Sequence, residues 1–513
     1  MSNQPTDPSR RIFLKSAAIG VAACAAGEMA EAAPPGARPA PLRRVQPEAV
    51  GIDSAAIAAF LAAVEAQPGG IHSFMLLRHG RVAAEGWWAP YAANYPHMLF
   101  SLSKSFTSTA VGFAVSEGLV NVEDTVVSFF PEKLPAKVGD NLAAMRVKHL
   151  LTMSTGHDVD ATGPTRANSE GDWVKGFLAL PVEHPPGSKF VYNSAATYML
   201  SAIVQKRSGK RVLDYLTPRL FAPLGIEGPT WETCPKGIDT GGWGLSVKTE
   251  DIARFGQCYL HNGQWNGRQI VPKEWVEAAT HRQVSNGDPA NASDWSQGYG
   301  YQFWRCRHDA YRGDGAFGQF CVVMPALDAV LAVTSGTGDM QAILNAAWDH
   351  LLPGIQSEVS TAGEASKTLR QKLAHLALPM PNGQPTSARA ALVSGKTFHF
   401  AANDFKLQTI RLNFTADRCT LSLQTENGLQ KQEYGNTSWI KGESTLEGTP
   451  STRTAGRGAW TADDTYTGLL CFYETPFTQT ATCTFTPDQV TLTLHRNVGF
   501  GPTDQPPLIA KLT

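Results

Sequence analysis

Hydrophobic and polar positions follow two different patterns along this chain of 513 residues. Between about Val45 and Ile355, stretches with apolar residues three and four positions apart alternate with short apolar runs. From Lys396 onward, apolar residues occur at every second position, and turn residues separate the runs. The first pattern predicts a mixed α/β domain, and the second predicts a small antiparallel β domain over 396–513.

The elements expected in the first domain place strands near its two ends and helices between them. Residues 73–78 and 81–87, joined at His79-Gly80, indicate a β-hairpin. The helical stretches are 195–206, 211–220, 250–261 and 342–352, and the later strands are 301–304, 319–323 and 329–334. We therefore expect an α/β core in which the two ends of the domain share one sheet.

The same patterns divide the chain into segments. A leader is expected over 1–33, a linker rich in Pro and Ala over 34–44, the α/β domain over 45–355 and the β domain over 396–513. Between the two domains, 356–395 combines a helical stretch with a loop that contains several prolines.

The leader has the features of an export signal. Ser9-Arg10-Arg11-Ile12-Phe13-Leu14-Lys15 precedes an uncharged stretch that ends at Gly27, and this order resembles a twin-arginine signal. The apolar run is shorter than the ~20 residues of a membrane-spanning helix, so we expect no permanent membrane span. We expect the signal to be cleaved and the protein to be periplasmic or secreted. A second interpretation is a lipoprotein box that ends at Cys24.

Composition excludes several classes of protein. With 42% hydrophobic and 17% charged residues, the chain is not wholly disordered, collagen-like or a coiled coil. A net charge of −1 without long runs of like charge argues against nucleic acid as a partner. The sequence has no CxxC or HExxH motif, so we expect no metal and no cofactor. It predicts no particular oligomeric state.

The seven cysteines that follow the leader are an odd number and cannot all pair. Proteins exported by the twin-arginine route fold first in a reducing cytoplasm. We therefore expect buried free thiols instead of a disulfide framework.

One segment carries the candidate chemistry. Residues 100–116 form a helical, almost wholly apolar pattern with a single charge, Lys104. A lysine near the start of a buried helix is desolvated, and its pKa falls. Ser101 lies three residues earlier, so on a helix its hydroxyl comes within hydrogen-bond reach of the amine. This arrangement supplies a nucleophile with its own base, beside the N–H groups of a helix N-terminus.

The pattern S-x-x-K is short, and a second match occurs at 438–441. That match lies in alternating sequence, where positions three apart point to opposite faces of a strand. We therefore prefer Ser101 and Lys104, whose surroundings are helical and nearly uncharged.

The segment 100–108, Phe-Ser-Leu-Ser-Lys-Ser-Phe-Thr-Ser, resembles the nucleophile segment of the serine β-lactamase and penicillin-binding superfamily, in its class C, esterase and D,D-peptidase branch. Further segments similar to that family follow in its order, at 147–156, 186–194, 243–246 and 251–256. The resemblance covers about 45–355. It implies an antiparallel sheet flanked by helices, together with an all-helical subdomain.

The resemblance also implies roles for individual residues. Ser101 is the expected acylated nucleophile, and Lys104 is its proton acceptor. Tyr192 is expected to return a proton to the leaving group, as a phenolate favoured by nearby ammonium groups. Ser194, in the same element, is expected to contact the substrate.

The chain departs from the family at its third element, because no K-T-G occurs and His261-Asn262-Gly263 lies after a predicted helix. The best placed segment is 313–319, where Gly315 and the N–H of Ala316 would complete an oxyanion hole. Asp314 is interpreted as an exposed turn residue. The missing cation normally holds a substrate carboxylate, and branches with G-x-x-G-Q here include esterases and 6-aminohexanoate-dimer hydrolases.

These observations predict a serine hydrolase that cleaves a small ester or amide through an acyl-enzyme on Ser101. A β-lactamase or D,D-carboxypeptidase is the alternative within the family. A ligand-binding or sensor protein without activity is the alternative from another class, although the presence of Ser101, Lys104 and Tyr192 argues against it. No G-x-S-x-G occurs, which argues against an α/β-hydrolase nucleophile.

Overall fold

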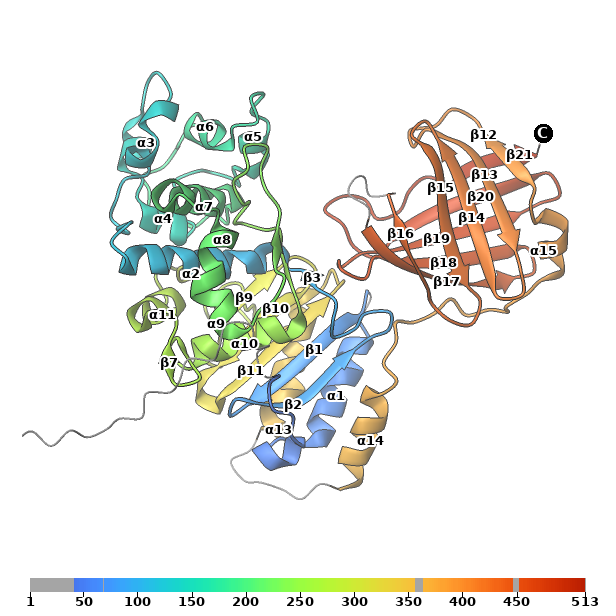
Figure 1. Ribbon diagram of the computed structural model, residues 1–513, viewed down its shortest axis with the longest axis horizontal. Helices are drawn as coiled ribbons and strands as arrows, with labels where there is room; N and C mark the ends of the chain where they lie inside the picture. The colour runs from blue at the N-terminus through green and yellow to red at the C-terminus, as the bar shows by residue number, and fades with distance from the viewer. Residues whose placement is uncertain (1–40, 68, 356–362, 446–451, 513) are drawn as a thin grey trace, which may run out of the picture. The chain divides into compact units, whose positions relative to one another are not determined.

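The computed structural model describes residues 41–67, 69–355, 363–445 and 452–512. The leader expected over 1–33 and the possible acylation site Cys24 lie outside these residues. Within the described part, the fold is a mixed α/β structure with a C-terminal β domain, as the sequence pattern predicts (Figure 1).

The central sheet of the α/β part is antiparallel and, among the described residues, has six strands in the order β2-β1-β11-β10-β9-β8. The strands are β1 (Ile71–Arg78), β2 (Arg81–Trp87), β8 (Trp304–Arg305), β9 (Tyr311–Gly315), β10 (Gln319–Met324) and β11 (Ala329–Ser335). Because β1 pairs with β11 in the register Phe74↔Val333, the two ends of the domain share the sheet as predicted. The strand expected over 301–304 begins only at Trp304, since Gln302 adopts a left-handed backbone with φ 67°.

Alternation along β1 divides the core into two layers. Phe74 and Leu76 pack on one face with α1 (Ser54–Glu65), α12 (Met340–Ala346) and α14 (Glu364–Leu373). Met75 and Leu77 pack on the other face with α2 (Ser103–Ser116) and α10 (Thr249–Leu260). Both faces of the sheet are therefore covered, which explains why β1 is apolar along most of its length.

A mostly helical region is inserted between β3 (His97–Met98) and β4 (Thr230–Trp231). After α2 it contains α3 (Asp140–Ala144), α4 (Val147–Leu151), α5 (Thr162–Arg166), α6 (Trp173–Leu178), α7 (Ser194–Ser208), α8 (Val212–Leu216), a π-helical turn (Thr217–Phe221) and α9 (Ala222–Leu224). The remaining elements before β8 are β5 (Leu245–Val247), β6 (Gln264–Trp265), β7 (Arg268–Gln269) and α11 (Lys273–Thr280). Helix α12 continues through a π-helical turn (Ala347–Leu351) into α13 (Leu352–Gly354).

The C-terminal domain, which follows α15 (Ala388–Val393), is a β-barrel. Its described strands are β12 (Thr397–Phe400), β13 (Leu407–Phe414), β14 (Arg418–Thr425), β15 (Gly428–Gly435), β16 (Ile440–Ser444), β17 (Thr452–Ala462), β18 (Thr465–Cys471), β19 (Thr478–Phe485), β20 (Gln489–Arg496) and β21 (Leu508–Leu512). Neighbouring strands are antiparallel, and a parallel contact between Gly435 and Arg457 joins β15 to β17 and closes the sheet. Closure leaves few free strand edges.

Two further expectations concern the described residues alone. All seven cysteines after the leader are buried and free, which confirms the prediction of unpaired thiols. Across the same residues, no helix is both long and apolar enough to cross a membrane.

Candidate active site

The candidate nucleophile lies on a short turn that leads into α2. Phe100–Leu102 is a 3₁₀ turn and the α-helix begins at Ser103, so the expectation of one α-helix from residue 100 is wrong by one turn. Phe100 has a left-handed backbone with φ 48°, a conformation that costs free energy in a non-glycine residue and is concentrated at functional sites. Half-buried Ser101 therefore stands on a sharp bend before the buried helix.

The buried Lys104 joins three parts of the chain. Its Nζ lies 2.9 Å from Ser101 Oγ, 2.9 Å from Ser194 Oγ and 2.7 Å from the carbonyl oxygen of Gly242. A carbonyl oxygen can only accept a hydrogen bond. A neutral amine with two N–H groups and one lone pair can therefore donate to Gly242 and one serine, and accept from the other serine hydroxyl.

The environment of Lys104 makes this neutral form accessible near neutral pH. Burial lowers the pKa of Lys104 from 10.5 to about 7, because the ammonium ion loses its hydration. The negative charges of Asp160 and Asp314 act in the opposite direction and keep the pKa from falling further. A lysine with this pKa is suited to accept a proton at pH 7.

The start of α7 brings the second predicted element to this amine. Asn193 caps the helix, its Oδ1 accepting a hydrogen bond from Ala195 N at 3.1 Å. The backbone N–H of Ser194 donates to Asp160 Oδ1 at 3.1 Å. These two bonds fix the Ser194 hydroxyl on Lys104 and place Tyr192 immediately before the helix.

The ring of Tyr192 lies between Lys104 and Trp304. Lys104 Nζ is 4.8 Å from the ring centroid, and Trp304 stacks on the ring at 5.5 Å with planes inclined by 20°. Burial raises the pKa of Tyr192 above its usual value, and the charge of Asp314 acts in the same direction, whereas a hydrogen bond with Ser101 opposes it. The expected phenolate is therefore wrong for the free protein, in which Tyr192 is a neutral phenol.

Strand β9 runs directly beside the nucleophile. A Cβ atom on Gly315 would collide with the carbonyl oxygen of Leu99 and would lie 3.0 Å from Ser101 N. Only glycine fits there, so the end of β9 and the nucleophile turn are held in contact. Ala316 follows at once, in a turn closed by a hydrogen bond from Gly318 N to Gly315 O at 3.2 Å.

Gln319, whose function the sequence did not indicate, braces this turn. Its Nε2 donates to Ala316 O at 3.0 Å and to Ser335 O at 2.8 Å. Gln319 thus ties the turn after β9 to the end of β11. The G-x-x-G-Q pattern contained this residue, but its hydrogen bonds depend on the neighbouring strand.

Asp314 is not an exposed turn residue, so that prediction is wrong. It lies within β9, is buried, and accepts a hydrogen bond at its Oδ2 from Arg312 Nε at 3.0 Å; Nη2 of the same guanidinium forms an ion pair with that oxygen at 2.9 Å. Residues two apart share one face of a strand, which explains the pairing. The Arg312 guanidinium lies 4.4 Å from the ring of Trp295 and 5.5 Å from that of Trp304, which in turn stacks on Tyr192.

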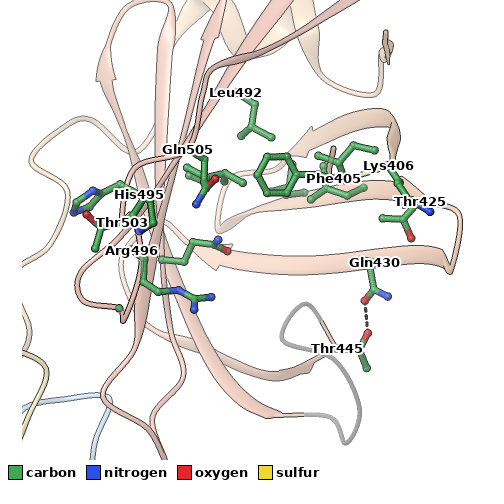
Figure 2. A pocket seen from close by; sticks show the side chains of 18 of the residues that line it. Phe405, Lys406, Thr425, Gln430, Thr445, Leu492, His495, Arg496, Thr503 and Gln505 are labelled. Carbon is green, nitrogen blue, oxygen red and sulfur yellow. Dashed lines mark hydrogen bonds between the residues drawn. The ribbon is translucent and has the colours of Figure 1, made fainter. Parts of the chain in front are cut away.

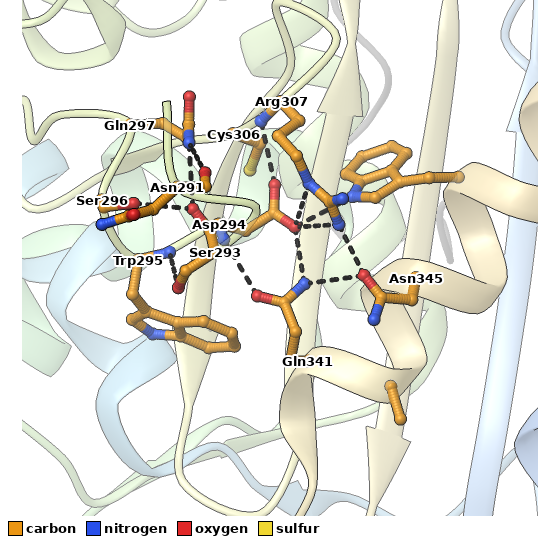
Figure 3. Close-up of polar contacts among 12 residues, drawn as sticks. Asn291, Ser293, Asp294, Trp295, Ser296, Gln297, Cys306, Arg307, Gln341 and Asn345 are labelled. Atoms are coloured by element: carbon orange, nitrogen blue, oxygen red, sulfur yellow. Dashed lines mark hydrogen bonds and ion pairs between the residues drawn. The ribbon is translucent and has the colours of Figure 1, made fainter. Parts of the chain in front are cut away.

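A second buried carboxylate anchors the segment that carries Trp295. Asp294 accepts hydrogen bonds from the backbone and side chain of Arg307 and from Gln341 (Figure 3). It also accepts one from Trp348, and its own carbonyl oxygen accepts one from Arg312 Nη1 at 2.8 Å. Such a fully bonded network is rigid. It therefore fixes the wall behind Tyr192.

An aromatic cluster borders the nucleophile turn on another side. The ring of Phe100 lies 5.4 Å from that of Phe317, which follows Ala316 and also has a left-handed backbone, with φ 66°. Two rings of the C-terminal domain complete the cluster: those of Phe477 and Phe500 lie 6.1 Å and 5.8 Å from the ring of Phe100.

The second S-x-x-K match lies away from this site. Ser438 is exposed in a bend, and Lys441 Nζ donates a hydrogen bond to Tyr95 Oη at 2.7 Å.

The beta-lactamase family model matches residues 58–351, more than half of the chain. The chain belongs to the beta-lactamase family. The family assignment and the beta-lactamase-like fold expected from the motifs around Ser101 and Tyr192 are thus confirmed, and the chain is part of a family of serine hydrolases.

Known proteins resemble the chain to different extents. The 6-aminohexanoate-dimer hydrolase of Paenarthrobacter ureafaciens is 28% identical over 313 residues, which are 57% of this chain and 79% of that protein. A beta-lactamase of Escherichia coli (strain K12) is 23% identical over 217 residues, 38% of this chain and 56% of the relative. Among solved structures, the match to a putative 6-aminohexanoate-dimer hydrolase from Bacillus anthracis covers 60% of this chain and 86% of the chain in that structure, with 20% identity and a TM-score of 0.48.

Proposed function

We propose that this protein is a serine hydrolase that cleaves a small ester or amide through an acyl-enzyme on Ser101. The observation that carries the proposal is the buried amine of Lys104, which lies 2.9 Å from the Ser101 hydroxyl and has a pKa of about 7. A hydroxyl paired with a neutral base is the arrangement that nucleophilic catalysis needs.

In the proposed acylation, protons move among the side chains of Ser101, Lys104 and Tyr192. As Ser101 Oγ bonds to the substrate carbonyl carbon, its proton passes to Lys104 Nζ. The carbonyl oxygen becomes an oxyanion, which the N–H groups of Ser101 and Ala316 are suited to stabilise. When the bond to the leaving group breaks, the phenol of Tyr192 donates its proton to that group and regains one from the Lys104 ammonium. Water then releases the acyl group by the same steps in reverse order.

The substrate class follows from the charges near the site. The family element that normally carries a cation holds Gly313-Asp314-Gly315 here. The nearest arginine on that strand, Arg312, is buried and paired with Asp314. Substrates that depend on a carboxylate anchor, such as β-lactams and peptidoglycan stems, are therefore disfavoured relative to neutral esters and amides. The relative named as a 6-aminohexanoate-dimer hydrolase makes a linear amide a sensible test substrate.

The experiment is intact-mass spectrometry after exposure to a fluorophosphonate probe. We expect one added probe mass on the wild-type chain and none on Ser101→Ala. Ser438→Ala is the matched control, because it removes the exposed serine of the second S-x-x-K match and should label like wild type. Labelling that persists in Ser101→Ala contradicts the proposal, and a wild-type chain that never labels favours the non-catalytic alternative.

A substrate panel then separates the hydrolase classes. We expect turnover of short p-nitrophenyl esters or of a linear amide dimer, and little turnover of nitrocefin or a D-alanyl-D-alanine peptide. Faster turnover of nitrocefin or of the peptide would favour the β-lactamase or carboxypeptidase alternative.

We further propose export by the twin-arginine route, which rests on Arg10 and Arg11 in the sequence. Replacing both by lysine is expected to retain the precursor in the cytoplasmic fraction of the host. Equal amounts of wild type and variant outside the cytoplasm would contradict this route. A fatty-acylated Cys24 in the mass of the mature protein would instead indicate a lipoprotein.

A further inference from the structure

The interior of the C-terminal barrel is filled at one end and hollow at the other. Since side chains alternate along each strand, every second residue points inward. At the filled end, the ring of Phe485 lies 6.2 Å from that of Phe398 and 5.9 Å from that of Trp460. At the opposite ends of the same strands, a cavity of about 910 Å³ opens (Figure 2). We call this cavity the cup.

The inner wall of the cup is largely hydrocarbon. It is formed by inward-facing residues of β13, β14, β15, β19 and β20, namely Leu407, Leu421, Leu423, Tyr434, Ala481, Leu492 and Leu494. A concave site of this size, lined mainly by apolar side chains with a few polar groups, is typical of small-molecule binding sites.

Polar groups occur at a few positions among these leucines. Gln430, Gln479 and Gln505 line the cup, and Gln430 Oε1 accepts a hydrogen bond from Thr445 Oγ1 at 2.6 Å (Figure 2). Carboxamides inside an apolar wall orient a ligand through hydrogen bonds without adding charge.

The charged residues of the cup lie at its mouth, where the strands end. Lys406 and Glu426 form an ion pair of 2.9 Å, so their charges compensate each other. Arg496, at the end of β20, places its guanidinium 5.2 Å from the ring centroid of Phe477. The charged groups of the mouth are thus in contact with partners within the protein, and the leucine wall of the cup carries no charge.

The mouth also exposes apolar rings to solvent. Phe405 is 40% exposed and Phe500 is 81% exposed, and both line the cup. Large exposed apolar side chains at the edge of a cavity are typical of a binding site. Phe500 also lies 4.9 Å from the ring of Phe317, so the mouth borders the aromatic cluster beside the nucleophile turn.

We propose that the cup is a binding site for an elongated molecule with a hydrocarbon body and one polar end. The body lies against the leucine wall, and the polar end forms hydrogen bonds with the lining carboxamides of Gln430, Gln479 and Gln505. This assignment concerns the C-terminal domain and does not depend on the chemistry of Ser101.

The test is a fluorescence titration of the full chain carrying Ser101→Ala with dansyl-undecanoic acid. This variant lacks the nucleophile, so binding is measured apart from hydrolysis. We expect saturable binding of one probe per chain and its displacement by dodecanoic acid. Ala481→Phe fills the cup and Leu494→Glu places a negative charge in its wall, so each should weaken binding at least about tenfold.

Thr482→Phe is the matched control, because it adds the same ring at the next position of β19, which alternation directs away from the interior. It should bind like the parent.

Three results would overturn the assignment. They are the absence of saturable binding, unchanged affinity in both Ala481→Phe and Leu494→Glu, and equal weakening by Thr482→Phe. Circular dichroism of each variant shows whether the fold is retained, and Leu494→Glu, at a half-buried position, provides the test if Ala481→Phe does not fold.

Discussion

The pH dependence of acylation follows from the burial of Lys104. Burial lowers the pKa of this lysine from 10.5 to about 7, and the difference corresponds to ~5 kcal/mol lost by the ammonium form. Only the neutral amine can accept the Ser101 proton. We therefore expect kcat/KM to fall as the pH is lowered through about 7 and to reach a plateau above it.

Asp160 offers a conservative way to move this pKa. Of the two carboxylates that favour the ammonium form, Asp160 has the larger effect, and it contacts Ser194, the hydrogen-bond partner of Lys104. Asp160→Asn keeps an acceptor oxygen but removes the charge, so the pKa of Lys104 falls. Because the carboxylate acts through one intervening residue, we expect the acidic limb to move to lower pH by roughly half a unit to one unit.

The assay is kcat/KM for a p-nitrophenyl ester from about pH 5 to about pH 9, with the rate of fluorophosphonate labelling as a second readout. Asp158→Asn is the control, since Asp158 is exposed and paired with Lys189 and His184. An acidic limb that stays in place in Asp160→Asn, or moves to higher pH, would refute the assignment of Lys104 as the base.

Three further predictions concern single positions. Gly315→Ala places a Cβ against Leu99 O and should lower kcat at least ~100-fold in the ester assay. Gly139→Ala is the control, because its Cβ meets no neighbour within 4 Å and should leave kcat unchanged. Equal rates of the two variants would show that β9 does not position the nucleophile. Tyr192→Phe keeps the ring on Trp304 but removes the hydroxyl, so kcat should fall ~10²–10⁴-fold, and an unchanged kcat would exclude its acid role. Asp314→Asn leaves the buried Arg312 without its anion and should lower the free energy of unfolding in urea by ~3–5 kcal/mol. Asp309→Asn, at an exposed position, should leave that free energy unchanged. Equal stability of the two variants would contradict the buried pair.

Much of the fold could be predicted from the sequence, because local patterns encode it. The 73–87 hairpin, the helices near 195–206 and 250–261, and the alternating strands after residue 396 are observed near their expected positions. The contact between Ser101 and Lys104 was also predictable, since it depends on a spacing of three residues.

Other features of the site depend on contacts between distant segments. Lys104 bonds to Gly242, which is 138 positions later in the chain, so this third partner could not be predicted from local spacing. Asp314 lies between two glycines, a context typical of a turn, but it pairs with Arg312, whose guanidinium lies over the rings of Trp295 and Trp304 from other segments. The protonation of Tyr192 was misjudged because burial, together with the negative charge of Asp314, raises the pKa of the phenol.

The C-terminal domain shows the same limit. Alternation predicts strands, but not that β15 and β17 meet in parallel and close the sheet. The cup therefore could not be inferred from the sequence, although the residues that line it obey the alternation.

The central claim is that Ser101 carries the acyl group during turnover, and it can be tested with a substrate. A p-nitrophenyl ester is mixed with excess chain, the reaction is quenched in acid, and the acylated peptide is located by tandem mass spectrometry. We predict a burst of one nitrophenol per chain and the acyl mass on Ser101. Hydrolysis without a burst and with no acyl group on Ser101, or with the acyl group on another residue, would contradict the account.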